Sequence, residues 1–498
     1  MRILDVPKSF LPCAVVAVAL AACATQPYTP ASGDLPVVPP AWTEALDAAP
    51  AAAGGERLAY WWRHFGDAGL STLVEQALER NNDVRSARAA LRQARAQRAV
   101  SAAGLQPTLD FAGSAQRART DSQPADNLFQ VGVDAAWEVD LAGGLRAGLA
   151  AAEADLLASA ASLDDTRVSI AAEVALAYID LRGNQQRLAV ARANLANQEE
   201  TLQITRWREQ AGLVTQLEVE QARTSVEQTR ASLSSLEDAV AQAINSLAVL
   251  GAQTPGDLRA QLLEAPGGAL AVVPRPADTL AVSLPADTLR QRPDVRAAGL
   301  RVEAARARVD EAQAARYPSL RLSGSLGLSA LTFGALDSAG VASSLLASVG
   351  LPLFDGGALA AQVEVRDAAL EQTYHEYGAA VLTALGEVEN ALTALRTSRD
   401  SLASLDRAAE AAANADELAG QRYASGLVDF QVVLDTQRTR LNAEDAVVSA
   451  AAQFAANHVQ LYKALGGGWS AQRATDPQSA SDAAPAALSA TAASSSAP

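Results

Sequence analysis

The chain has 498 residues and a formal net charge of -16 at pH 7, which disfavours a nucleic-acid partner because like charges repel. Its length allows two or three domains. No run of about 18 apolar residues follows the N-terminal segment, so a later segment that crosses a membrane has to be a strand.

The N-terminus has the layout of a secretory signal peptide. Arg2 and Lys8 flank the start of an apolar run that ends in small residues before Cys23. The tetrad Leu20-Ala21-Ala22-Cys23 is similar to a bacterial lipobox, in which cleavage leaves an acylated cysteine. We therefore predict a signal peptide over residues 1–22 and a covalent lipid on Cys23. A chance cysteine after an apolar run remains the alternative.

The rest of the chain contains an internal duplication. The segment around Asp83 returns around Asp294, 211 positions later, and Gly212-Leu213-Val214 returns as Gly426-Leu427-Val428. This period is far longer than that of solenoid repeats, so each copy is expected to contain several elements.

Long helices are predicted in two stretches that lack proline. Each stretch begins at a glycine pair and is interrupted by a lone glycine, Gly212 or Gly426. This pattern predicts helical hairpins over residues 143–250 and 356–465, with a first arm roughly 100 Å long. Leucines recur every seventh residue in that arm, as in a coiled coil. A lipid-anchored helical rod explains these features equally well.

Four strands argue against the rod. Residues 129–141 alternate between apolar and polar or small side chains, and the repeat alternates after Tyr317-Pro318. Weaker strands are predicted at 105–117 and 344–354. One face then carries Phe129, Val131, Val133, Trp137 and Leu322, and the other carries Gln130, Asp134, Glu138, Arg321 and Ser323. Four strands cannot close a barrel, so a membrane role requires several copies. The edge of a soluble β-sandwich is the alternative.

Three segments carry a family resemblance. Residues 60–67, with the sequence YWWRHFGD, residues 284–298, with the sequence LPADTLRQRPDVRAA, and residues 317–320, with the sequence YPSL, resemble signatures of TolC-like outer-membrane efflux factors of the NodT-type lipoprotein branch. The resemblance runs in order from about Tyr60 to Leu465.

The resemblance implies a mainly α fold with a membrane β-barrel portion, in which each protomer gives four strands and long coiled-coil hairpins. It also implies a homotrimer that works as a passive duct without catalysis. Its partners are then a periplasmic adaptor, an inner-membrane pump of the proton-driven RND type and outer-membrane lipid. The outer-membrane duct of a type I protein secretion system is the alternative function.

Site residues follow from the same resemblance. The adaptor-contact tips are expected at Gly212, Leu213, Val214, Gly426, Leu427 and Val428, although the two glycines also fit ordinary left-handed turns. The periplasmic gate is expected at Asp429 and Asp435, where threefold symmetry gives rings of charge that attract cations. An ordinary solvated helix face is the alternative for these two residues. Val432 is apolar where some relatives are acidic.

Catalytic patterns are weak by comparison. His375-Glu376 lacks the second histidine of a zinc-protease helix, because Ala379 stands at that position. No metal, no catalytic residue and no cofactor other than the lipid on Cys23 is predicted. The predicted domains are a signal peptide (1–22), a lipidated tether (23–56), a first repeat (57–252), an equatorial linker (253–286), a second repeat (287–468) and a disordered tail (469–498).

Overall fold

The computed structural model describes residues 58–119, 126–264, 272–276, 289, 291–336 and 339–468. The predicted signal peptide, the tether with Cys23 and the tail over 469–498 lie outside the described residues. Within these ranges, no helix combines the length and the apolarity needed to cross a membrane.

The described residues form two compact units, and each unit draws on both halves of the duplication. The first unit combines Ser86–Leu163 with Pro293–Thr383. The second unit combines residues 58–85, the described part of 164–292, and 384–468. The repeats therefore supply corresponding segments to the same unit, and neither repeat is a compact body by itself.

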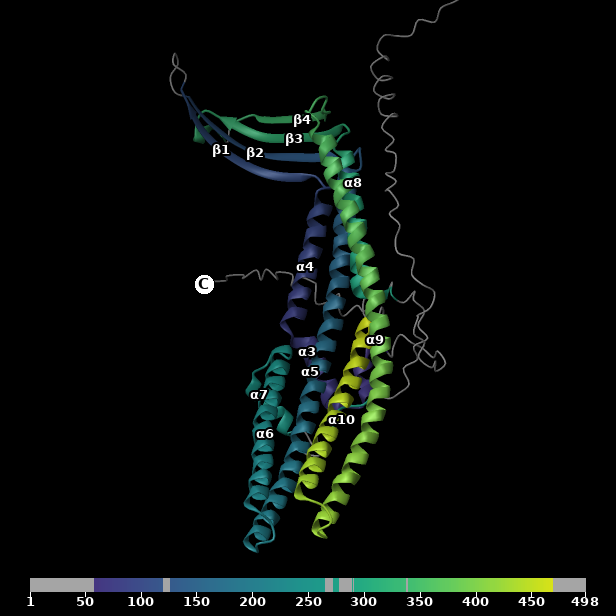
Figure 1. Cartoon of the computed structure of the whole chain (residues 1–498). Helices are drawn as coiled ribbons and strands as arrows, with labels where there is room; N and C mark the ends of the chain where they lie inside the picture. Colours follow the sequence, from purple (N-terminus) through teal and green to yellow (C-terminus); the bar gives the residue numbers. More distant parts are fainter. Residues whose placement is uncertain are drawn as a thin grey trace, which may run out of the picture. The chain divides into compact units, whose positions relative to one another are not determined.

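The first unit contains one antiparallel sheet whose strands lie in chain order (Figure 1). The strands are β1 (Thr108–Ala118), β2 (Asp126–Val139), β3 (Ser319–Ala330) and β4 (Val341–Gly350). Within the described part of the chain, β1 and β4 each pair along one side only. The sheet thus has two open edges.

The strand register separates an apolar face from a polar face. Val133 lies opposite Phe111 and Leu326, whereas the next residue, Asp134, lies opposite Asp110 and Ser325. Directly paired residues point to the same side of a sheet. The residues that the sequence assigned to one face therefore share it, and those assigned to the other face share the other.

Several strand boundaries differ from the prediction. β1 covers Thr108–Ala118 and not 105–117, and β2 begins at Asp126 and not at Phe129. β2 ends at Val139 and not at Leu141, because Asp140 turns the chain toward the next helix. β4 covers Val341–Gly350 and not 344–354. Pro352 lies in the part that was wrongly assigned, and proline has no N–H to donate to a ladder.

At both strand-to-helix junctions, an aspartate side chain accepts backbone hydrogen bonds from residues at the start of the following helix. Asp140 accepts backbone N–H bonds from Leu145 and Arg146 at 3.3 and 3.0 Å, and Asp355 accepts them from Gly357 and Leu359 at 2.9 and 2.7 Å. Burial raises the pKa of Asp140, but hydrogen bonds from Arg146 and Leu145 outweigh burial and lower it overall. The backbone bonds from Leu359 and Gly357 lower the pKa of Asp355. Each aspartate therefore stabilises the start of a long helix.

The long helices repeat in length as well as in order. The first hairpin consists of α5 (Gly144–Gln210) and α6 (Gln216–Leu250), and the second of α9 (Ala358–Ala424) and α10 (Phe430–Ala464). Both first arms have 67 residues and both second arms have 35. The predicted hairpins are present, and their turns fall at the predicted glycines.

Shorter helices complete the fold. They are η1 (Trp61–Phe65), α3 (Ala68–Arg80), α4 (Asn82–Ala103), α7 (Pro255–Glu264), α8 (Pro293–Ala314) and η3 (Phe333–Ala335). α7 lies within the segment predicted as the equatorial linker. Pro255 occupies the first helical position, where a missing N–H costs nothing, and the Thr254 hydroxyl accepts a bond from the N–H of Asp257 at 3.3 Å.

Candidate functional site

Both hairpins turn at a glycine in the left-handed backbone region. Gly212 has a φ of 70° and Gly426 has a φ of 73°. In each turn the glycine N–H donates to the carbonyl three residues earlier, and the following leucine donates to the carbonyl five residues earlier, at 2.8 to 3.0 Å. These two bonds form a glycine C-cap. The two ends of the hairpins, hereafter the tips, therefore close in the same way.

The tips present apolar side chains to solvent. Leu213 is 69% exposed and Leu427 is 74% exposed, while Val214 and Val428 are half-buried. A Cβ built on Gly212 or Gly426 would meet no atom within 4 Å. The glycines are thus required by backbone conformation and not by close packing.

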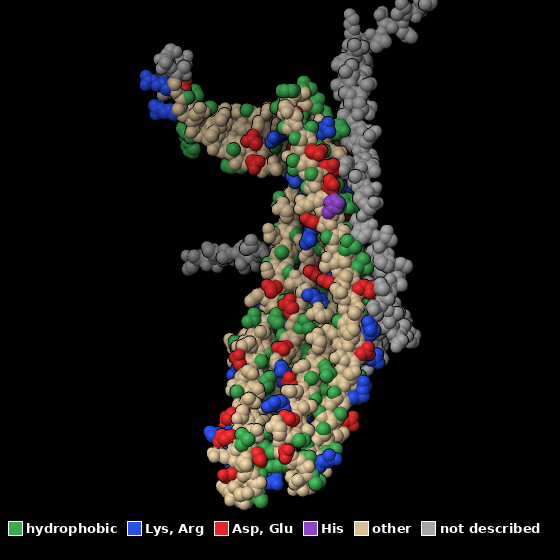
Figure 2. All heavy atoms as spheres, viewed as in Figure 1, with side chains coloured by type: hydrophobic (Ala, Val, Ile, Leu, Met, Phe, Trp, Pro, Cys, Tyr) green, Lys and Arg blue, Asp and Glu red, His purple; other side chains and the backbone are tan. Residues whose placement is uncertain are grey.

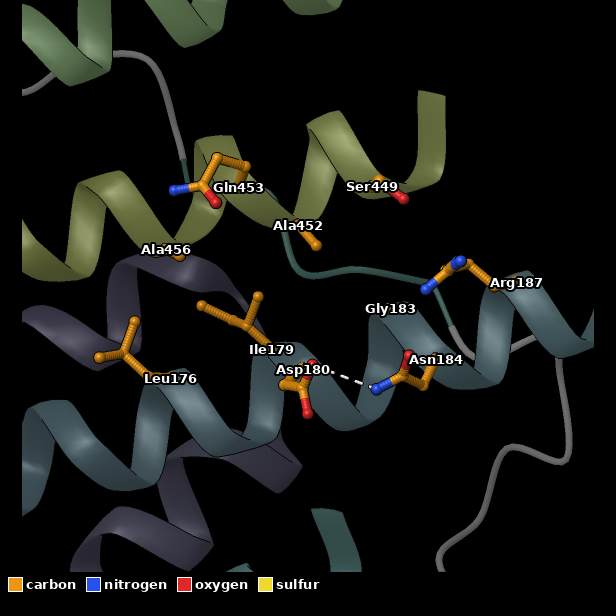
Figure 3. Close-up of a pocket in the computed structure, with 10 residues that line it drawn as sticks. All are labelled: Leu176, Ile179, Asp180, Gly183, Asn184, Arg187, Ser449, Ala452, Gln453 and Ala456. Carbon is orange, nitrogen blue, oxygen red and sulfur yellow. Dashed lines mark hydrogen bonds between the residues drawn. The ribbon is translucent and has the colours of Figure 1, made fainter. Parts of the chain in front are cut away.

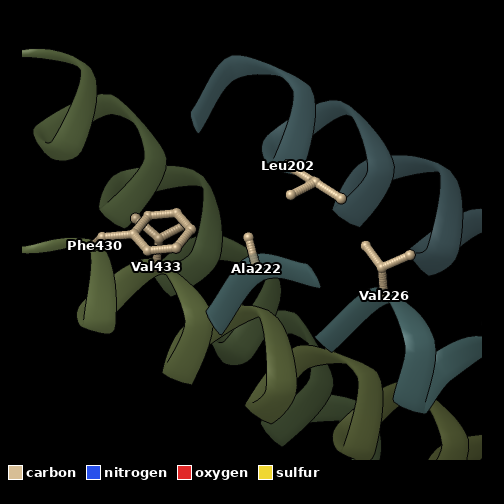
Figure 4. Close-up of a cluster of buried hydrophobic side chains, with 5 residues drawn as sticks. All are labelled: Leu202, Ala222, Val226, Phe430 and Val433. Carbon is tan, nitrogen blue, oxygen red and sulfur yellow. The ribbon is translucent and has the colours of Figure 1, made fainter. Parts of the chain in front are cut away.

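A small apolar cluster lies behind the tips. Figure 4 shows its five side chains converging from α5, α6 and α10: Leu202, Ala222, Val226, Phe430 and Val433. Phe430 is the first residue of α10 and is only 3% exposed. The two hairpins are therefore held together by side-chain packing close to their turns.

Tyr423 connects the ends of the two first arms. The Cζ atom of Arg208, from α5, lies 4.4 Å from the centroid of the Tyr423 ring, and the ring of Phe430 lies 5.4 Å away. Burial raises the pKa of Tyr423; the charge of Arg208 opposes this shift and that of Glu218 adds to it. A cation and an anion from the first hairpin thus act on one phenol of the second hairpin.

The predicted gate residues lie at and shortly after the start of α10, and both are exposed. Asp429 is the N-cap residue of α10, and its side chain makes no capping hydrogen bond. Asp435 accepts a bond from Gln431 Nε2 at 3.0 Å. Both carboxylates therefore remain available to solvent or to ions.

A second acidic group, which the sequence analysis missed, lies deeper between the helices. Arg440 bonds to Asp416 of α9 at 3.3 Å and to Glu444 at 2.8 Å, and Asn194 of α5 donates to Glu444 at 3.0 Å. The spacing of Arg440 and Glu444 is the usual one for a helical ion pair and was a usable signal. No local pattern marks Asp416, since its contact depends on the packing of α9 against α10.

A groove with a mixed polar and apolar lining runs between α5 and α10, farther from the tips. Figure 3 shows residues from both helices around a cavity of about 270 Å³, lined on one side by Asp180, Asn184 and Arg187 and on the other by Ser449 and Gln453. Arg187 also forms a two-point ion pair with Asp445, at 2.6 and 3.1 Å. The two helices approach closely where Gly183 faces Ala452. A Cβ atom added to Gly183 would lie only 3.2 Å from the Cβ atom of Ala452, so a larger residue at position 183 would crowd this contact.

The family-signature residues contact the C-terminal end of α10 and the middle of α5 and α9. Arg292 is buried; it donates to the Ala464 carbonyl at the end of α10 and to Glu387 of α9, both at 2.7 Å. Tyr178 of α5 donates to the carboxylate of Asp67, which also accepts the Leu70 N–H as the cap of α3. The signatures therefore hold helices in place.

Histidines and carboxylates do not assemble into a metal centre in the described ranges, where no group of three potential ligands occurs. His64 and His458 interact with backbone carbonyls of their own segments, and His375 lies 3.7 Å from Glu371.

Comparisons with known proteins agree with this geometry. Residues 73–252 and 284–467 match a family model described as outer membrane efflux protein. A Pseudomonas putida protein named probable efflux pump outer membrane protein TtgC is 32% identical over 95% of this chain and 98% of its own length. Nodulation protein T of Rhizobium leguminosarum bv. viciae is 30% identical over 95% of this chain and 96% of its own length.

A solved structure shows the same fold. The outer-membrane channel OprN aligns with a TM-score of 0.77 and 35% identity, covering 82% of this chain and 93% of that chain. The predicted fold class is therefore confirmed.

Proposed function

Since the chain belongs to the outer membrane efflux protein family, we propose that three copies form one exit duct that carries the cargo of an inner-membrane pump to the cell exterior. The duct conducts passively and performs no catalysis. The rod alternative leaves the four-stranded sheet unexplained, and no observation favours a type I secretion duct.

The sheet is the observation that carries this proposal. It has one apolar and one polar face, and β1 and β4 leave backbone groups unpaired on their outer sides in the described structure. An open edge is costly in hydrocarbon, where no water replaces the missing bonds. Pairing β1 of one copy with β4 of the next removes every edge, and three copies give a barrel with an even number of strands.

The tips suit a partner that presents an apolar surface. Leu213 and Leu427 are exposed apolar side chains on rigid glycine-capped turns. We assign this surface to a periplasmic adaptor, which joins the duct to a pump of the proton-driven RND type. The name of the Pseudomonas putida relative, probable efflux pump outer membrane protein TtgC, supports this assignment.

The gate is assigned to Asp429 and Asp435. A trimer places three copies of each carboxylate around one axis, and such rings concentrate cations. The arginine–tyrosine contact behind them holds the two hairpins of one copy together and favours a closed end.

The anchor is assigned to Cys23. A lipid on this residue ties the N-terminus to the outer membrane, whereas the sheet inserts into it. The tether then needs no catalytic or binding role.

Reconstitution in cells tests the proposal. A host that lacks its own efflux ducts receives the chain together with a pump and its adaptor, and export of a fluorescent dye is measured. We expect export only when the chain and an active pump are both present. Equal export without the chain, or with an inactive pump, contradicts the proposal.

A further inference from the structure

The sheet carries arginines at one end of its apolar face. Among the described strand residues of that face, Arg117 of β1 is the only charged one, and Arg119 follows directly after the strand. Both side chains are exposed, and the described structure gives neither an acidic partner. By contrast, Asp110, Asp134, Glu138 and Arg321 all lie on the polar face.

The position of Arg117 along the sheet is fixed by the register. The chain enters and leaves the sheet by helices at one end, so the turns after β1 and β3 lie at the other, helix-distal end (Figure 1). Arg117 is the second-last residue of β1 and lies opposite Asn127 of β2. Lys or Arg side chains gather at this end of the sheet in Figure 2.

Aromatic side chains bound the apolar face at both ends. At the helix-distal end, Phe129 packs edge-to-face against Phe333 with ring centroids 5.9 Å apart. At the other end, Trp137 donates its indole N–H to the Leu105 carbonyl at 3.1 Å. Phe129 and Trp137 are eight residues apart on one strand, or about 27 Å, and a tilted strand of this length suits the apolar band of about 25 Å in outer-membrane barrels.

This band places Arg117 just outside the hydrocarbon. Asn127, its partner in the register, lies two residues beyond Phe129, or about 7 Å farther along the strand. With a strand tilt of about 40°, this length places Asn127 about 5 Å closer to the membrane surface than Phe129, at the level of the lipid headgroups. A guanidinium there points toward the layer where anionic lipids carry their phosphates, and it matches a phosphate with two parallel hydrogen bonds.

We propose that Arg117 and Arg119 bind the phosphate of a lipid headgroup in the outer leaflet of the membrane that surrounds the sheet. The proposal rests on the proposed function, because it requires the apolar face to contact lipid. The acyl chains lie along Leu109 and Phe111 of the same strand and face, which are each 74% exposed. A lipid can contact the arginines through its phosphate and the apolar side chains through its acyl chains, whereas a free anion can contact only the arginines.

The test uses purified full-length protein in detergent and native mass spectrometry. Diphosphorylated lipid A is the lipid probe, the same lipid without phosphates is the lipid control, and inorganic phosphate is the free-anion control. We expect the wild type to retain the diphosphorylated lipid. Because each interfacial arginine contributes a similar increment, Arg117→Gln with Arg119→Gln should weaken retention about 25-fold, or about fivefold for each residue.

Arg321→Gln is the matched control, since it removes one arginine from the polar face of the same sheet. It should leave retention unchanged, and Arg117→Lys with Arg119→Lys should retain most of the binding. Unchanged retention in the double glutamine variant, an equal loss in the Arg321 control, or equal binding of inorganic phosphate would each overturn the proposal. Ion conductance in planar bilayers is measured on the same variants. If a variant keeps its conductance but loses lipid binding, the lipid site is separate from the duct function. If the wild type itself shows no conductance, the proposed duct function is contradicted.

Discussion

The guanidinium of Arg208 lies over the ring of Tyr423, with 4.4 Å between its Cζ atom and the ring centroid. Arg208 is in the last turn of α5 and Tyr423 is in the last turn of α9, so the contact joins the two hairpins of one chain just before their tips. A duct whose end closes by helix contacts is sensitive to such a contact.

Loss of this contact should favour the open end. A cation–π contact at a partly exposed site contributes about 1 kcal/mol, which corresponds to about a fivefold change in the ratio of open to closed duct. Arg208→Ala should therefore raise the open probability in planar bilayers about fivefold, and adding Tyr423→Leu should change little more. Arg206→Ala, at an exposed neighbouring position, is the control. Fully additive effects of the two substitutions would contradict a direct contact.

The gate assignment predicts a change in cation block. Asp435→Asn should raise the divalent-cation concentration that half-blocks the current, because it removes three charges from one ring in a trimer. Asp429→Asn should act in the same direction. Asp238→Asn on α6, an exposed carboxylate bonded to Gln242, serves as the control. If block is the same in the wild type and the Asp435 variant, Asp435 does not line the gate.

The tip assignment predicts loss of export without loss of fold. Leu427→Ser removes an exposed apolar side chain and requires no strained backbone, so the protein should reach the membrane in normal amounts and fail in pump-dependent export. Leu418→Ser changes a leucine of α9 that is 55% exposed and lies outside the turn. Normal export by the Leu427 variant, or equal failure of both, would argue against an adaptor surface at this tip.

Arg292 should contribute strongly to stability. Its side chain is 7% exposed and bonds to both Glu387 and the Ala464 carbonyl. Arg292→Met leaves both acceptors without this donor, and we expect a loss of about 2 to 4 kcal/mol. Thermal unfolding in detergent measures the loss, with the exposed Arg85→Met as the reference. A melting temperature equal to that of the Arg85 variant would contradict the assigned role.

The phenol of Tyr178 should lose its proton at a higher pH than an ordinary tyrosine. Burial, the largest effect, raises the pKa of Tyr178 to about 12 despite the opposing bond from Arg182. A phenol with a raised folded-state pKa contributes stability that is complete below the unfolded value of about 10 and is lost as pH rises through about 12. The ultraviolet absorbance titration of the wild type should contain a step near pH 12 that Tyr178→Phe removes. If Tyr178→Phe instead removed part of the step near pH 10, where ordinary tyrosines titrate, this environment would be contradicted.

Helix ends were predictable because single residues mark them. The glycines at 212 and 426 stop α5 and α9 within two residues of the predicted positions, and proline-free sequence defines the helical stretches. Strand ends were less accurate, since alternation continues past the last ladder bond at Val139. The face of each strand was still correct, because a period of two fixes it once one apolar residue is placed.

Contacts between helices were not predictable from local pattern. Asp416 and Arg440 meet because α9 and α10 pack at one particular rotation, and a change of one residue would separate them. The Arg208–Tyr423 contact has the same origin. The buried role of Arg292 was also hidden, because an arginine before proline and aspartate looks like an exposed helix start.

The current through purified protein in a planar lipid bilayer, recorded together with the mass of the inserted species, tests the exit-duct account most directly. We predict discrete, ohmic current steps from a species of three chains, with no requirement for nucleotide or a proton gradient. Stable insertion of the folded protein without current steps, or steps from a single chain, would contradict it.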